Sequence, residues 1–243
     1  MYKLILVVVF NCLIMSRVTA QQNLFNIPSG DITPKGKVFY QHQINTYSNK
    51  FESKSHFVYG IGKKWDVGVN VVGSGAYFNP NWKPIYNSDF SQGAALSPTI
   101  LATAQKQWTI NEKWSVNIGT QTGMNLSNNT ANIRPAYLHY GLASYQVKPG
   151  RRLLVGPYVT NNQYVGAGNN AGIHAGYEWK IDKKWYLMGD FISGNNDSSV
   201  LVTGFMYNAS KRVQLCMGYM LPNPKTIKNQ AIVLEFNWYG WDF

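Results

Sequence analysis

The sequence predicts an all-β protein, a transmembrane antiparallel up-and-down β-barrel of about 12 strands. Three observations predict this fold class. A short turn motif with basic residues recurs along the chain, the residues on both sides of each turn alternate in polarity, and short connections alternate with long ones. Because no long helical periodicity follows residue 21, these features favour hairpins that turn at the same two ends of one sheet.

Residues 1–20 have the properties of a secretory signal peptide. Lys3 supplies a positive charge, residues 4–15 form an apolar core, and Ala20 ends a run of small residues of the kind that a signal peptidase recognises. The apolar core is shorter than the ~20 residues of a membrane-spanning helix, which disfavours an uncleaved anchor. We therefore expect cleavage before Gln21 and a single barrel domain over residues 21–243.

The predicted mature chain is basic and contains one cysteine. The whole sequence has 22 Lys and Arg against 11 Asp and Glu. The lysines lie in short turns rather than along one stripe, which indicates solvated turns and no nucleic-acid partner. Cys216 has no possible disulfide partner after the signal is removed, and the four scattered histidines lack the spacing of a zinc site. We expect no metal and no cofactor.

The turn motif joins a polar turn that carries Lys or Arg to an aromatic or aliphatic residue that opens an alternating run. In the three strongest copies that residue is Trp65, Trp114 or Trp185. Five copies of one hairpin turn form an internal repeat, which is strong evidence for the architecture. The copies cover 62–69, 111–118, 149–156, 182–189 and 210–217.

Alternation with a period of two is clearest at 171–181. There Ile173 and Trp179 share an apolar face, while His174 and Glu178 share the opposite face. Twelve such runs can be counted, and an even number puts both chain ends on one side, as in bacterial single-chain barrels. The predicted strands cover 37–48, 51–62, 65–78, 95–110, 114–126, 134–147, 152–164, 170–181, 185–194, 199–208, 213–222 and 230–241.

The connections and the aromatic residues both favour a membrane barrel over a soluble sandwich. Long polar links such as 79–94 and 161–169 alternate with the short turns, as in outer-membrane barrels. Aromatic residues flank the short turns, and around a barrel they would form a girdle at one membrane interface. The expected girdle comprises Tyr59, Trp65, Trp108, Trp114, Trp179 and Trp185.

The C-terminal residues 238–243, WYGWDF, form the most specific motif of the sequence. A terminal Phe243 with aromatic residues two and four positions earlier, Trp241 and Tyr239, resembles the signal that outer-membrane barrels present to the barrel-assembly machinery. This resemblance implies a protein of the cell outer membrane, with the lipid bilayer and that machinery as partners. Because the preceding apolar face contains Phe236, a change of register is needed near Gly240.

If the apolar face meets lipid, the other face lines a polar lumen of mixed charge. Two residues do not fit this scheme, because His42 and Lys106 fall on the apolar face. A charge at mid-bilayer would cost ~2–4 kcal/mol, so either Lys106 extends to the interface or the register there differs by one. The expected lumen-lining residues are Lys54, His56, Asp66, His139, His174, Glu178, Asp190 and Glu235.

Two segments near the start of the mature chain carry a family resemblance. Residues 26–37 and the hairpin 59–68, YGIGKKWDVG, resemble the entry segment and the first hairpin of small transport barrels associated with the meta-pathway degradation of aromatic compounds such as phenol. The resemblance covers roughly the first quarter of the mature chain. It implies passive uptake of small molecules and assigns no site residues.

The sequence favours a passive channel or transporter for small solutes and not an enzyme. In the outer-membrane phospholipases a catalytic His and Ser stand two residues apart on one strand face, whereas no hydroxyl lies two residues after any His here. The alternatives are a structural or interaction barrel with a plugged lumen and partner-binding outer loops, and, third, a lipid-modifying enzyme. The link 79–94 would form either a constriction or a surface loop.

Overall fold

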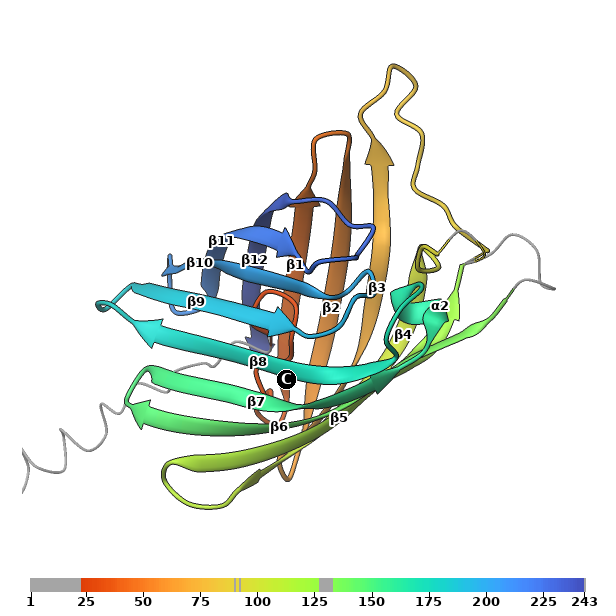
Figure 1. Cartoon of the computed structure of the whole chain (residues 1–243). Helices are drawn as coiled ribbons and strands as arrows, with labels where there is room; N and C mark the ends of the chain where they lie inside the picture. The colour runs from red at the N-terminus through yellow and green to blue at the C-terminus, as the bar shows by residue number, and fades with distance from the viewer. Residues whose placement is uncertain (1–22, 90, 92, 127–132, 243) are drawn as a thin grey trace, which may run out of the picture.

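The computed structural model describes residues 23–89, 91, 93–126 and 133–242, which form a closed antiparallel barrel of twelve strands (Figure 1). Each strand pairs with its neighbours in sequence, and β1 pairs with β12 to close the sheet, which confirms the predicted fold class. The predicted signal peptide lies outside the described residues. The strands are β1 (Lys37–Thr46), β2 (Lys50–Gly62), β3 (Trp65–Tyr77), β4 (Thr99–Thr109), β5 (Trp114–Asn125), β6 (Pro135–Lys148), β7 (Arg151–Thr160), β8 (Ala171–Lys180), β9 (Trp185–Ile192), β10 (Val200–Asn208), β11 (Val213–Pro222) and β12 (Ala231–Asp242).

Three of the short turns share one hydrogen-bond pattern. Asn111 Oδ1 accepts from the backbone N–H groups two and three residues later, both at 2.9 Å. Asp182 Oδ1 does the same at 2.7 and 2.8 Å, and Ser210 Oγ does so at 3.1 Å. A short polar side chain at this position satisfies two N–H groups of the reversing chain, which explains the recurring turn motif.

The turn between β2 and β3 reverses the chain through its backbone conformation instead of a side-chain acceptor. Lys63 and Lys64 both adopt positive φ, at 51° and 63°. Two successive left-handed residues make the two-residue hairpin turn whose twist matches that of the flanking strands. The turn between β6 and β7 uses Gly150, with φ of 75°, in the same region.

The short turns lie at one end of the barrel, and the long connections lie at the other (Figure 1). The long connections are joined to one another: Ala167 N donates to Gly93 O at 2.7 Å, and Asn223 N donates to Ser199 O at 3.0 Å. A single helical turn, α2 (Asn162–Val165), lies among them. It ends the predicted strand 152–164 at Thr160, because Asn161 Oδ1 caps the turn by accepting from Tyr164 N. In the described ranges, no helix has the length and apolar character to cross a membrane.

The register between β1 and β12 shifts near the C-terminus. Phe39 pairs with Tyr239, but Lys37 pairs with Asp242, so β12 has one extra residue between these pairs. This bulge confirms the change of register expected near Gly240. Tyr239 points inward, and its hydroxyl donates to Gln214 Oε1 at 2.7 Å. The role of Tyr239, Trp241 and Phe243 as an assembly signal stays a prediction, and Phe243 lies outside the described residues.

The two residues that did not fit the predicted faces do point outward. Lys106 Nζ lies 5.1 Å from the ring centre of Trp65 and donates to Lys63 O at 2.9 Å, so the ammonium group extends toward the short turns. His42 Nδ1 lies 2.8 Å from Ser55 Oγ on the neighbouring strand. The predicted register was therefore correct at both positions, and each polar group finds a partner on the outer wall.

Candidate functional site

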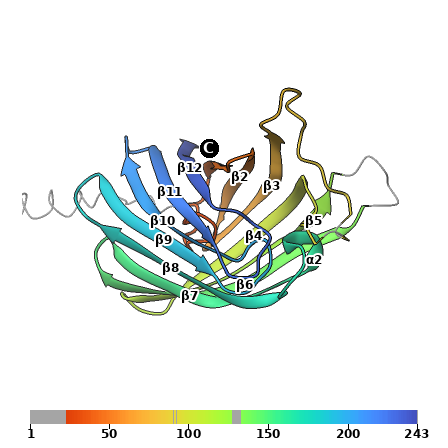
Figure 2. The same cartoon turned by 45° about the horizontal axis from the view of Figure 1, so that its top comes forward.

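Residues 23–36, here called the plug segment, lie inside the barrel before β1 begins (Figure 2). Leu24, Phe25 and Ile27 have no exposed surface and join the apolar core of the lumen wall. This part of the wall includes Tyr158 and Met188. A barrel of twelve strands is wider than one that its own side chains fill, and the plug segment occupies the difference.

Glycines on the inner face make room for the plug segment. A Cβ on Gly176 would lie 2.5 Å from Leu24 Cδ1, and a Cβ on Gly218 would lie 2.8 Å from Phe25 Cζ. Real Cβ atoms do not approach other heavy atoms so closely. Gly176 and Gly218 are therefore contact sites for the plug segment and not simply small residues of an open pore.

Charged residues of the wall hold the backbone of the plug segment. Asp66 Oδ2 accepts from Thr33 N at 2.8 Å, and Asp190 Oδ2 accepts from Ile27 N at 3.1 Å. Lys54 Nζ donates to Phe25 O at 2.8 Å. Carboxylates thus meet backbone N–H groups, and the lysine meets a carbonyl. These contacts satisfy buried polar groups of a segment that has few sheet partners.

One buried arginine joins the plug segment to the wall through two carboxylates. Arg152 Nη2 lies 2.6 Å from Asp31 Oδ2 and 3.1 Å from Glu178 Oε2. The three side chains are between 10% and 15% exposed, so the charges are largely screened from water by protein. Glu178 therefore acts on the plug segment indirectly, through Arg152 on the adjacent strand β7.

The other predicted lumen residues also point inward, with one exception described below. His56 Nδ1 lies 3.0 Å from Asn23 Nδ2. The His174 ring stacks on Tyr158, with the ring centres 4.6 Å apart. Glu235 Oε1 accepts from Asn237 Nδ2 at 2.8 Å. The wall residues thus fall into separate groups around the plug segment rather than one cluster.

The expectation that His139 lines the lumen is wrong. Its side chain is exposed on the outer wall, where Nδ1 lies 2.8 Å from Thr120 Oγ1, and its neighbours Leu138 and Tyr140 point inward. The rule that the polar face turns inward fails on β6, because here the wall is part of an apolar core that includes Leu24 and Ile27. The plug segment, rather than water, determines the polarity of this part of the wall.

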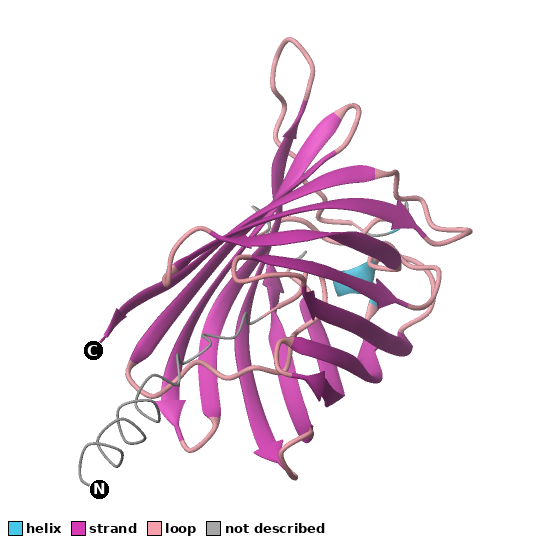
Figure 3. Cartoon of the chain, turned by 90° about the vertical axis from the view of Figure 1, so that its left-hand side faces the viewer, coloured by secondary structure: helices cyan, strands magenta, loops and turns pink. Residues whose placement is uncertain are grey.

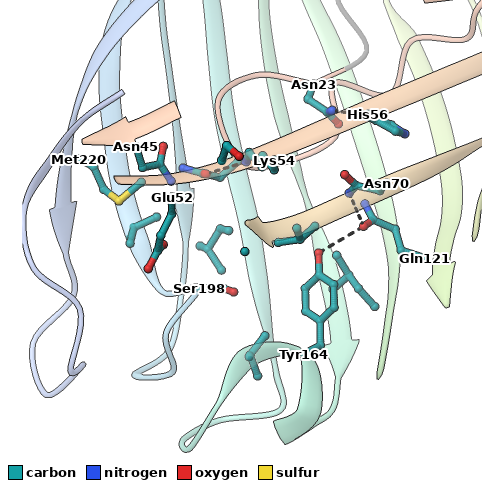
Figure 4. Close-up of a pocket in the computed structure, with 18 of the residues that line it drawn as sticks. Asn23, Asn45, Glu52, Lys54, His56, Asn70, Gln121, Tyr164, Ser198 and Met220 are labelled. Atoms are coloured by element: carbon teal, nitrogen blue, oxygen red, sulfur yellow. Dashed lines mark hydrogen bonds between the residues drawn. The ribbon is translucent and has the colours of Figure 1, made fainter. Parts of the chain in front are cut away.

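A cavity of about 140 Å³ remains between the plug segment and the outer loops (Figure 4). Asn23 and Asn26 line it from the plug segment, and Glu52, Tyr164 and Lys228 line it toward the outer end. A cavity of about 150 Å³ accepts a molecule of the size of benzene, so this one would hold a single small molecule. Several buried polar atoms of its lining have no hydrogen-bond partner among the described residues: Asn26 Nδ2, Gln41 Nε2, Asn70 Oδ1 and His174 Nδ1.

The outer wall has a His–Ser pair that spans two strands, so the spacing of residues along a single strand does not reveal it. His42 on β1 and Ser55 on β2 are direct partners across the two strands. Both lie about four residues from Tyr59, which is ~13 Å along a strand and ~10 Å across a bilayer at the usual tilt. With the predicted girdle residue Tyr59 at the interface, the pair would lie deeper than the phospholipid esters, and this depth would not favour lipid hydrolysis.

No protein-family model matches the chain, and no curated protein matches it. Among solved structures it is similar to the NanC porin, with a TM-score of 0.56 and 9% identity over 84% of this chain and 100% of that chain. It is also similar to the KdgM porin in complex with disordered oligogalacturonate, with a TM-score of 0.55 and 9% identity over 84% and 99% of the two chains. It is also similar to an outer-membrane channel from Pseudomonas putida F1, with a TM-score of 0.52 and 10% identity over 87% of this chain and 98% of that chain. The shared feature is the fold of outer-membrane β-barrels.

Sequence reasoning did not find the plug segment or the role of Arg152. The link 79–94 instead lies at the outer end, where Ala76 pairs with Pro84 and Asn87 pairs with Ser97. The signal that the sequence offers is three apolar residues before the first strand, Leu24, Phe25 and Ile27. The structure shows that all three are fully buried. Such residues are unusual in a solvated leader segment, but the sequence alone does not say what they pack against.

Proposed function

We propose that the chain is an outer-membrane channel that admits small solutes passively, and that passage depends on displacement of the plug segment. The observation that carries this proposal is the position of the plug segment between the outer cavity and the short-turn end of the lumen. The segment is held by hydrogen bonds and one ion-pair group, and wall residues on several strands supply its partners. Such contacts can open without unfolding the barrel.

The proposal places the barrel in the outer membrane with the short turns on the periplasmic side. Three similar structures with TM-scores above 0.5 are two porins and a channel, which supports transport as the class of function. Their solutes are not carried over to this chain, because identities of 9–10% relate the folds alone. Uptake of aromatic compounds, which the hairpin at 59–68 implied, stays part of the proposal as one solute class to be tried.

A second candidate function is a structural or interaction barrel with a permanently closed lumen. The hydrogen bonds that join the outer loops to one another favour it, among them Asp197 N to Val165 O at 2.9 Å. In that case the plug segment would be a structural element, and the joined loops would form a rigid surface for a partner. The two candidates differ in whether any solute crosses the folded barrel.

A reversible disulfide between the plug segment and the wall distinguishes the two. Gly30 has a φ of 76°, so a cysteine there strains the backbone, but its Cβ would lie 3.5 Å from Asn117 Cβ, within the ~3.5–4.5 Å range of disulfides. Mature Gly30→Cys/Asn117→Cys protein, with Cys216→Ser to remove the native thiol, is reconstituted in liposomes. Swelling in small sugars, amino acids and aromatic acids is then measured with and without reductant.

We expect slow swelling for the oxidised protein and faster swelling after reduction, because the reduced plug segment regains its freedom to move. The Cys216→Ser protein and each single cysteine variant serve as controls that reductant must not affect. Equal swelling rates in the two redox states would show that the plug segment does not control passage. No swelling in either state, by protein with the gel mobility of a folded barrel, would favour the structural barrel.

A further inference from the structure

The basic residues of the described chain are concentrated at the short-turn end of the barrel. Eleven exposed or half-buried basic residues lie in the five short turns or at the strand ends that flank those turns, against two acidic residues of similar exposure, Glu112 and Asp182. This basic rim consists of Lys63, Lys64, Lys106, Lys113, Lys148, Arg151, Lys180, Lys183, Lys184, Lys211 and Arg212.

The ion pairs of the described residues lie elsewhere in the barrel. Lys50 and Lys228 both pair with Glu52 at the outer end, and Arg152 pairs with Asp31 and Glu178 in the lumen. Five carboxylates, those of Asp31, Asp66, Glu178, Asp190 and Glu235, lie in the lumen rather than at the rim, and the rim has a large positive surplus. A concentration of positive charge on one surface favours a negatively charged partner on that side.

Three basic side chains of the rim lie over aromatic rings of the outer wall. Lys106 Nζ lies 5.1 Å from the ring centre of Trp65 and 5.7 Å from that of Trp108. Arg151 lies 4.9 Å from the Trp179 ring on the other side of the barrel. Lys184 Nζ lies 5.7 Å from the ring of Tyr207.

These cation–aromatic pairs come from strands spread around the barrel: β3 and β4, then β7 and β8, then β9 and β10 (Figure 1). Figure 3 shows the same barrel from another side, with strands in its wall and loops at its two ends. A rim that faced only water would not need aromatic rings beside these three cations. Rings and cations together match a lipid surface, where the ring lies at the level of the headgroups and the cation meets phosphate.

We propose that the basic rim is a binding surface for anionic phospholipid headgroups in the leaflet that surrounds the short-turn end. The proposal rests on the proposed placement of the barrel in the outer membrane. Lysine and arginine donate to phosphate oxygens, and the neighbouring indole rings pack on the glycerol region. Each basic residue close to an anionic lipid surface favours binding about fivefold, so several together select anionic lipid from a mixture.

The tryptophans provide a reporter that is confined to the rim. Of the eight in the chain, seven lie in strand ends or turns at this end, and Trp82 alone lies in an outer loop. The Trp82→Phe protein is therefore reconstituted in vesicles whose phosphatidylcholine or phosphatidylglycerol carries bromine in its acyl chains. Bromine quenches tryptophan in contact with the lipid, so mixtures of the two report which lipid occupies the rim.

We expect brominated phosphatidylglycerol to quench about fivefold more effectively per mole than brominated phosphatidylcholine at low salt. About 0.5 M salt should reduce this preference, because exposed charges are then screened. The Lys106→Gln/Arg151→Gln protein should show a clearly smaller preference, because it lacks two rim charges that lie beside tryptophan rings. The matched control, Lys83→Gln/Lys225→Gln, removes two exposed charges of the outer loops and should retain it.

Equal quenching by the two lipids, or a preference that the rim variant keeps and the outer-loop variant loses, would overturn the proposal. A folded barrel that conducts solute but shows no lipid preference would refute the rim site and leave the channel intact. A barrel with the preference but no solute flux would leave the rim site intact and refute the channel. The two proposals therefore fail separately.

Discussion

The ring of Phe25 lies in the space that a side chain on Gly218 would occupy, since a Cβ there would be 2.8 Å from Phe25 Cζ. The two residues are far apart in sequence, and one belongs to the plug segment while the other belongs to β11. Their contact links the plug segment to the inner face of the barrel.

The Gly218→Val change is expected to displace Phe25 and loosen the plug segment. Overpacking of a filled interior costs about 1–3 kcal/mol, so the free energy of unfolding in detergent should fall by that amount. Solute flux should rise, because the barrel wall itself is unchanged. The control is Gly141→Val, whose new Cβ would meet only Asn117 O at 3.9 Å. Equal effects of the two changes would show that the contact with Phe25 is unimportant.

Loss of the Arg152 guanidinium is expected to be strongly destabilising. The Arg152→Met change leaves Asp31 and Glu178 close together without their shared cation. Breaking a buried ion pair by removal of one partner costs about 3–5 kcal/mol, which urea titration of the refolded barrel would detect. Arg152→Lys keeps the charge but not the fork geometry and should cost less. A loss below about 1 kcal/mol for Arg152→Met would mean that water already solvates these carboxylates.

The outer end is expected to weaken at alkaline pH. Burial raises the pKa of Tyr47 to about 12; the nearby Lys228 lowers this pKa and Glu52 raises it, both by smaller amounts. Burial lowers the pKa of Lys228, but the nearby Tyr47, Glu52 and Asp197 outweigh it, so the net shift of the Lys228 pKa is upward. Both pKa values are higher in the folded protein than in the unfolded chain. Their contribution to stability is therefore present below about pH 10 and is lost as the pH rises through the folded values.

This alkaline effect can be isolated by comparison of the wild type with a Tyr47→Phe/Lys228→Met variant. Urea midpoints are measured from about pH 8 to about pH 12. The variant should be less stable at the lower pH and should lose less stability on titration, because the two groups no longer release protons on unfolding. Parallel curves for the two proteins would contradict the assignment to this pair.

The turn at Asn111 is expected to stabilise its hairpin through the side chain. Asn111→Ala removes the acceptor for Lys113 N and Trp114 N, at a cost of about 0.5–1.5 kcal/mol. Asn111→Asp keeps the acceptor, as Asp182 does in its own turn, and should be close to neutral. Refolding yield and urea midpoint of the three proteins test this. A neutral Asn111→Ala protein would leave the recurring turn motif without a structural reason.

The elements that were predicted well are those that depend only on residues close to one another in the sequence. The turns at Asn111, Asp182 and Ser210 recur because each needs a short polar acceptor followed by a reversing chain. The alternation of β8 likewise follows from the period of a strand, which puts His174 and Glu178 inside and Ile173 outside. Both signals lie within a dozen residues and need no knowledge of the rest of the chain.

The assignment of His139 was wrong because the side chain's orientation depends on residues that are distant in the sequence. A strand shows which residues share a face, but the fold decides which face meets lipid. On β6 the apolar residues Leu138 and Leu142 turn inward and belong to the same buried apolar cluster as Leu24 and Ile27 of the plug segment, so His139 turns outward. The pairing of His42 with Ser55 was missed for the same reason, since the register of two strands brings the residues together.

The sequence by itself determined the twelve strands, the turns that join them and the side-chain period of each, because these depend on neighbours along the chain. It did not determine the contents of the lumen. That depends on Asp66, Asp190, Lys54 and Arg152, which reach the plug segment from four different strands. Only closure of the barrel brings these four strands around one space, where their charged side chains can bind the plug segment.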